Sequence, residues 1–149
     1  MDKPHQRIGA LSNSHVGAAF EKAALEHYLR QGQILRRDFP LDIGVANVTK
    51  RHVFDLGSDE PKVIIECKSH KWTSGGLVPS AKMTTWNEAM YYFHLAPPEY
   101  RKIFFTLHHR REASGETLVA YYKRTYAHLI PTDVEFVEFD EVSGQVFVE

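Results

Sequence analysis

Three stretches of the sequence carry apolar residues at helical spacing. The first extends from about His15 to Gln31, with Ser14 as its predicted N-cap and Gly32 as its stop. Its apolar positions are Val16, Phe20, Ala23, Ala24 and Tyr28. The pattern predicts two further helices over Ala81–Leu95 and Glu116–Leu129.

Five shorter stretches are typical of strands, because they alternate apolar and polar residues or form short apolar runs. They are Leu41–Val48, Val53–Gly57, Val63–Lys68, Ile103–Leu107 and Val134–Phe139. The predicted order is therefore α-β-β-β-α-β-α-β, which indicates an α/β fold.

No linker or repeat divides this order, so residues 14–149 are expected to form a single domain and residues 1–13 a polar N-terminal arm. With 43% hydrophobic and 25% charged residues, the composition is that of a globular protein. No apolar run has the length of a membrane span, and we expect no membrane partner. The single cysteine, Cys67, excludes an internal disulfide framework, so a cytoplasmic location is the expectation.

The most informative residues lie on the second and third predicted strands. A polar turn, Ser58–Lys62, joins the two strands as a hairpin. If the hairpin is centred between Glu60 and Pro61, Asp55 falls opposite Glu66, with Cβ atoms roughly 5 Å apart. Lys68 returns to the face of Glu66, because side chains of a strand alternate with a period of two.

Two opposed carboxylates repel each other unless a cation lies between them. Hard divalent cations such as Mg²⁺ take oxygen ligands, and often only one or two carboxylates. Asp55 and Glu66 are therefore candidate ligands for Mg²⁺ or Mn²⁺, and Lys68 completes a constellation typical of a hydrolytic site.

This pattern resembles the PD-(D/E)XK nuclease superfamily. Asp55 matches the first acidic residue, and Glu66-Cys67-Lys68 matches (D/E)-X-K; the proline is replaced by Phe54. The resemblance implies a restriction-endonuclease-like fold, an αβββαβ core with a mixed central sheet flanked by helices. It also implies that the Cys67 carbonyl is a third metal ligand, whereas the thiol packs on the opposite face.

Glu21 is a fourth candidate for the catalytic site. Its neighbours three and four residues away on the helix are small or apolar: Gly17, Ala18, Ala24 and Leu25. A carboxylate in that setting needs a partner, and many members of the resembled family carry a first-helix glutamate near the metal. The alternative is a rim acid paired with a lysine.

The net charge of −1 is low for a nucleic-acid-binding protein, but the basic residues occur in local clusters. Arg36, Arg37, Lys71 and Lys82 are the candidates for nucleic-acid binding. Asn87 and Tyr91, four residues apart on a predicted helix, are similar to the Gln-x-x-x-Tyr element of exonuclease-like relatives, although such an aromatic helix is more often part of the core.

The sequence thus favours a metal-dependent nuclease, with Mg²⁺ or Mn²⁺ at Asp55 and Glu66 and Lys68 at the attacking water; the resemblance implies DNA as the substrate. A domain of this size is expected to rely on a homodimer or higher oligomer, or on a partner protein, for target selection. The alternative is a binding module for nucleic acid or protein that keeps the fold without cleaving. No phosphate-binding loop or Gly-x-Ser-x-Gly elbow is present, which argues against a nucleoside triphosphatase or an α/β hydrolase.

Overall fold

The computed structural model describes residues 13–149. The expected N-terminal arm lies outside the described residues, apart from Asn13, with which the first helix begins. In chain order the elements are α1 (Asn13–Arg30), β1 (Arg36–Ile43), β2 (Lys50–Asp59), β3 (Lys62–Lys68), α2 (Ser80–Leu95), β4 (Arg101–Leu107), α3 (Leu118–Thr125), the 3₁₀ turn η1 (Ala127–Leu129), β5 (Val134–Phe139) and β6 (Val146–Val148).

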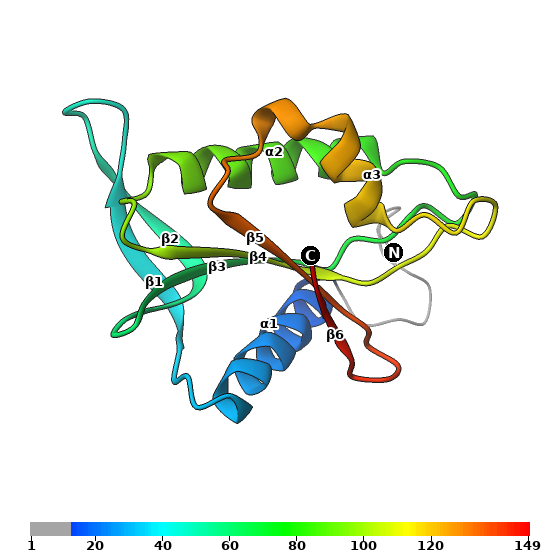
Figure 1. The fold of residues 1–149 in the computed structure, drawn as a ribbon, viewed down its shortest axis with the longest axis horizontal. Helices are drawn as coiled ribbons and strands as arrows, with labels where there is room; N and C mark the ends of the chain where they lie inside the picture. Colours follow the sequence, from blue (N-terminus) through cyan, green and yellow to red (C-terminus); the bar gives the residue numbers. More distant parts are fainter. Residues whose placement is uncertain (1–12) are drawn as a thin grey trace, which may run out of the picture.

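The strands form one mixed sheet in the order β1-β2-β3-β4-β5-β6. Strands β1, β2 and β3 are antiparallel, β3, β4 and β5 are parallel, and β6 returns antiparallel to β5. Helix α1 lies on one face of the sheet, and α2 and α3 lie on the other (Figure 1). The predicted α/β class, with a mixed sheet flanked by helices, is confirmed.

The sheet separates two hydrophobic clusters, and adjacent residues of β4 enter different ones. Phe104 packs beneath α2 and α3, with its ring centroid 5.2 Å from that of Trp86. Phe105 packs beneath α1, with its ring centroid 5.4 Å from that of Phe20. Strand β4 is buried on both faces because helices cover both, which explains why its sequence is a continuous apolar run.

The first strand differs from its prediction. It covers Arg36–Ile43 rather than Leu41–Val48, and residues 44–49 form the turn to β2. The turn is tight, since a Cβ on Gly44 would lie 1.8 Å from the Val48 carbonyl oxygen. Pro40, which cannot donate a hydrogen bond to a sheet ladder, is tolerated because β1 is an edge strand.

Two other elements also differ from the prediction. The helix predicted over Glu116–Leu129 is divided into α3 and η1, and the short strand β6 was not predicted. Among residues 13–149, no helix is long and apolar enough to cross a membrane.

Gly57 of β2 is where the sheet tolerates no side chain. A Cβ at this position would lie 2.5 Å from Cγ of Phe39, which is itself buried. Gly57→Ala is therefore expected to lower the free energy of unfolding by about 1–3 kcal/mol, the usual cost of overpacking a core. Urea unfolding followed by circular dichroism measures it.

Gly17→Ala on α1 is the matched control for that substitution. A Cβ on Gly17 meets no atom within 4 Å, and alanine is the better helix former. The control protein should be as stable as wild type or more so. Equal stability of the two variants would show that Phe39 moves aside at no cost.

Candidate active site

The side-chain alternation of β2 is interrupted at Asp55. Phe54 packs beneath α2, whereas Leu56 packs beneath α1. Residues two apart on a regular strand share one face, so the backbone direction changes between them. Strand β1 changes at the same level, where Asp38 has a φ of 53° and lies between the two pairs Arg37↔Leu56 and Phe39↔Phe54.

The hairpin of β2 and β3 has the predicted register as far as the pair Leu56↔Ile65. Asp55 and Glu66 are the next residues on the two strands, but they do not form a regular ladder pair. Instead, Oδ2 of Asp55 accepts a hydrogen bond from the backbone N–H of Cys67 at 2.8 Å. The two acids therefore lie near each other where β2 and β3 separate, and they are not a cross-strand pair of the ladder.

Glu66 is a buried carboxylate, with 6% of the residue exposed. Its Oε1 lies 3.0 Å from Nε2 of His52. Burial raises the pKa of Glu66 to about 7 and the charge of Asp55 adds to that rise, whereas His52 and Lys68 oppose it. A negative charge on Glu66 is therefore costly in the protein alone, and a nearby cation would stabilise it.

Glu21 reaches the same acids from α1. Burial raises the pKa of Glu21, and the Asp55 carboxyl raises it further by its charge and by a side-chain hydrogen bond, while Arg37 lowers it. Helix α1 contacts both β2 and β3, which explains how its side chain approaches Asp55. The structure thus brings Glu21 to Asp55, where the sequence had left a rim acid paired with lysine as the alternative.

Lys68 ends β3, and its charge acts on both neighbouring groups. It lowers the pKa of Glu66 and also that of His70. The Cys67 thiol packs with the cluster beneath α1, as expected for a side chain on the opposite face. Burial raises the pKa of this thiol, and Asp55, Glu21 and Glu66 raise it further, so it is a poor nucleophile.

The residues present fit a hard divalent cation through oxygen atoms. The charge of Asp55 disfavours a negative charge on both Glu66 and Glu21, and Glu66 is largely removed from water. Within residues 13–149, no three His, Cys, Asp or Glu side chains are placed together as a metal-binding group. A cation would thus be held by two carboxylates together with main-chain or solvent oxygen, as is common for Mg²⁺.

Two of the candidate DNA-binding residues line one groove beside Lys68. Lys71 and Lys82 border a groove of about 350 Å³ that also includes His70 and Val16. The charges of Lys68 and Lys82 both lower the pKa of His70, so the three cationic or titratable side chains are close to one another. Lys71 is paired with Glu141 at 2.9 Å.

The two arginines of β1 are separated from that groove. Arg37 donates to the carbonyl oxygen of Ala18 on α1 at 3.2 Å and lowers the pKa of Glu21, so it lies on the α1 side of the acids. Arg36 lies over the ring of Phe39 at 5.1 Å and lines a different pocket. The structure therefore places Arg37 near the site and gives Arg36 a packing contact.

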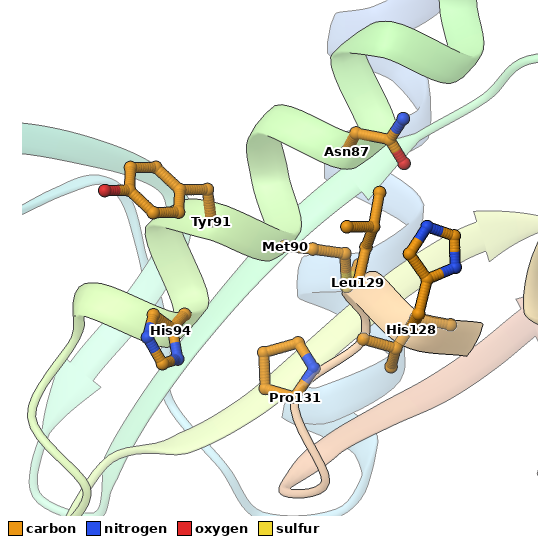
Figure 2. A pocket seen from close by; sticks show the side chains of 8 residues that line it. Asn87, Met90, Tyr91, His94, His128, Leu129 and Pro131 are labelled. Atoms are coloured by element: carbon orange, nitrogen blue, oxygen red, sulfur yellow. The ribbon is translucent and has the colours of Figure 1, made fainter. Parts of the chain in front are cut away.

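Asn87 and Tyr91 line a pocket between α2 and η1 (Figure 2). Oδ1 of Asn87 accepts a hydrogen bond from the Tyr122 hydroxyl at 2.8 Å, which ties α2 to α3. The Tyr91 side chain is half exposed. Asn87 therefore has a structural role between the two helices, whereas Tyr91 stacks on His94 of its own helix.

Two histidines near the acids were not predicted. His52 contacts Glu66, and Nδ1 of His70 accepts a hydrogen bond from the buried indole N–H of Trp86 at 2.8 Å. Burial, with the charges of Lys68 and Lys82, lowers the pKa of His70 to about 4, so this ring is neutral at physiological pH. Regular alternation along β2 gives no reason to pair His52 with Glu66, because the interruption at Asp55 changes which side chains meet.

A second buried carboxylate lies two strands away from Lys68, along the row Lys68↔Thr106↔Glu138. Glu138 is 1% exposed, and its Oε1 lies 3.4 Å from Nδ1 of His108. In the described part of the chain, neither of these two atoms has a hydrogen-bond partner. Burial, followed by the charge and hydrogen bond of Glu149, raises the pKa of Glu138 to about 8.

Glu138→Gln is expected to stabilise the protein at alkaline pH. The neutral form of Glu138 is favoured in the folded state, so its contribution is complete below the ordinary pKa of 4.5 and is lost as the pH rises through about 8. Glutamine removes that loss, which we expect to be on the order of 1–3 kcal/mol, the usual cost of taking a polar group out of water. Thermal unfolding at pH 9 and pH 4 measures it, and a gain of the same size at both values would contradict it.

None of the protein-family models compared with this chain matches it, and neither a curated protein nor a solved structure does.

Proposed function

We propose that this protein is a metal-dependent nuclease that hydrolyses phosphodiester bonds, with DNA as its substrate. The observation that carries the proposal is the position of Asp55, whose Oδ2 accepts from the backbone N–H of Cys67 next to Glu66 and whose charge acts both on Glu66 and on Glu21 of α1. The charge of Lys68 acts on Glu66. Carboxylates whose charges repel one another destabilise the fold, and a bound cation would relieve that repulsion. Such an arrangement is expected where a cation is part of the function.

Each residue has a role in this proposal. Asp55 and Glu66, with the Cys67 carbonyl, would hold Mg²⁺ or Mn²⁺, and Glu21 would assist from α1. The cation would supply Lewis acidity toward a phosphoryl oxygen. Lys68 would orient the attacking water and stabilise the negative charge that develops on the phosphate, as a compact ammonium can.

The order of elements supports the same proposal. Helix α1, the meander β1–β3, helix α2 and strand β4 form an αβββαβ series on a mixed sheet. That series is the core order of the restriction-endonuclease-like fold, to which we assign the chain. The acids lie on α1, β2 and β3, which supports this assignment.

The groove at Lys71 and Lys82 is the proposed path of the nucleic-acid backbone, because it adjoins Lys68 and carries cationic side chains. Arg37 approaches the acids from the α1 side. A single small domain offers little further surface for recognition, so we expect a homodimer or higher homo-oligomer. Endonuclease action on DNA is the expected mode.

The test is cleavage of supercoiled, linear, single-stranded and branched DNA by the purified protein with Mg²⁺ or Mn²⁺, and with EDTA as the control. Cleavage that requires the cation and elutes with the protein in gel filtration is the expected result. Binding to DNA without cleavage of any DNA or RNA form would instead favour the non-catalytic binding module. Conversion of the supercoiled substrate into nicked circles would establish endonuclease action.

A further inference from the structure

His52 makes the hydrogen bond that fixes one oxygen of Glu66. Its Nε2 lies 3.0 Å from Oε1, and the two side chains are 21% and 8% exposed. The ring is held on two sides. It stacks on Tyr92 of α2 with centroids 3.9 Å apart and a 25° interplanar angle, and it meets Phe54 edge-on at 4.5 Å.

The chemistry of the pair defines which atom donates. An ionised carboxylate only accepts hydrogen bonds, so Nε2 of His52 must carry a proton when Glu66 is charged. The contact uses Oε1 and leaves Oε2 for another partner. Because the imidazole is clamped between aromatic rings, it limits the rotation of the Glu66 carboxylate as well as its charge.

We propose that His52 is a positioning residue that holds the Glu66 carboxylate ready for a divalent cation and so sets the cation affinity of the site. The inference rests on the proposed function. It assigns to His52 no contact with substrate or with the cation, since its action passes through Glu66. Partners of this kind typically change metal affinity or activity by 10–100-fold when they are removed.

A purely structural role is the competing explanation, since the stacked ring also joins β2 to α2. His52→Phe separates the two roles, because phenylalanine keeps an aromatic ring between Tyr92 and Phe54 but has no N–H. His52→Gln is the complementary variant, because its amide N–H₂ can donate to Glu66 although the ring is gone. His94→Phe is the matched control: His94 is exposed on α2, where it stacks on Tyr91.

The experiment measures Mn²⁺ affinity by electron paramagnetic resonance of the free ion, with no nucleic acid present. For His52→Phe we expect a dissociation constant about 10–100-fold higher than for wild type. His52→Gln should recover most of the affinity, and His94→Phe should equal wild type. Binding of DNA in EDTA should be the same for all four proteins, because no cation contributes to it.

The outcomes distinguish this inference from the proposed function. A wild-type protein that binds no Mn²⁺ and cleaves nothing would overturn both. A wild-type protein that binds Mn²⁺ and cleaves DNA, with the same Mn²⁺ affinity in folded His52→Phe, would overturn the positioning role alone. If circular dichroism shows that His52→Phe is unfolded, the comparison passes to His52→Gln and His52→Asn. The His52→Asn protein, whose amide is shorter by one methylene, should bind Mn²⁺ more weakly than His52→Gln. Equal Mn²⁺ affinities of the two variants would overturn the inference.

Discussion

Asp55→Asn and Glu66→Gln are each expected to reduce cation-dependent DNA cleavage by about 10³-fold while DNA binding is retained. The amides have nearly the shape of the acids, and the amide oxygen that replaces Oδ2 of Asp55 can still accept from the Cys67 N–H. What is lost is the charge that holds the cation, whose stabilisation of the reacting phosphate is worth several kcal/mol. A loss of about 4 kcal/mol corresponds to the stated change in rate. Binding should persist or tighten, because a negative charge near phosphate has been removed.

Lys68→Ala should also stop cleavage, but with a different effect on binding. The ammonium is a cation beside the acids, so its removal weakens binding modestly at low salt and reduces the salt dependence. Single-turnover cleavage and fluorescence anisotropy at several salt concentrations measure the two effects separately. The pattern expected is unchanged or tighter binding for the acid variants and looser binding for the lysine variant.

Glu21→Gln has an internal control on the same helix. Glu21 approaches Asp55, whereas Glu26 is exposed and paired with Lys22 at 4.0 Å. Glu26→Gln should therefore leave cleavage unchanged, and Glu21→Gln should reduce it. Cleavage at the wild-type rate by both Asp55→Asn and Glu66→Gln would show that the activity does not come from this site.

The helices and central strands were predictable because their signals are local. The apolar residues of α1 are four apart, and the continuous apolar runs of β3 and β4 record burial on both faces. Strand β6 has three residues, of which Phe147 and Val148 are exposed. It carries no pattern long enough to distinguish it from a loop, and pairing with β5 defines it.

The first strand was misplaced because its position depends on a distant partner. The residues that pair with β2 begin at Arg36, and Asp38 adopts a left-handed backbone conformation within the strand. The apparent alternation beyond Ile43 belongs to a turn, in which Val45 and Val48 are exposed. A local pattern of apolar residues cannot show that these valines have no core to face.

The candidate site was predictable in composition but not in geometry. The register of the hairpin follows from its turn, and it brings Asp55 and Glu66 to the same level. The change of direction at Asp55 is made jointly by β1 and β2, so neither strand predicts it alone. That change explains why Asp55 meets Glu21 on the α1 side of the sheet and why His52, which stacks on Tyr92 of α2, reaches Glu66.

At pH 8 and without a divalent cation, the Glu66→Gln protein is expected to be more stable than wild type. Burial raises the pKa of Glu66 from 4.5 to about 7, and the charge of Asp55 contributes to that rise. An acid whose pKa is raised by folding contributes its full stability at pH values below its ordinary pKa. That contribution is lost as the pH rises through the pKa of the folded state. A rise of this size corresponds to about 3 kcal/mol of stability, lost between pH 4.5 and 7.

Glutamine remains neutral at every pH in this range, so the variant lacks that loss. Its advantage over wild type should be near its minimum at pH 4 and should rise to about 3 kcal/mol at pH 8. Other titrating groups, Glu138 among them, are present in both proteins and cancel in the difference. Urea unfolding of the two proteins in EDTA at pH 4, 6 and 8 measures the effect.

Addition of Mg²⁺ should reverse the order at pH 8. A cation that binds the folded state stabilises it in proportion to the logarithm of its concentration above the dissociation constant. Wild type should therefore gain stability with Mg²⁺, whereas Glu66→Gln should gain little. Glu138→Gln is the control, since it removes a different buried acid and should keep the full response to Mg²⁺. Parallel pH profiles for wild type and Glu66→Gln would show that Glu66 is already compensated within the protein, and an equal response of all three proteins to Mg²⁺ would place the cation elsewhere.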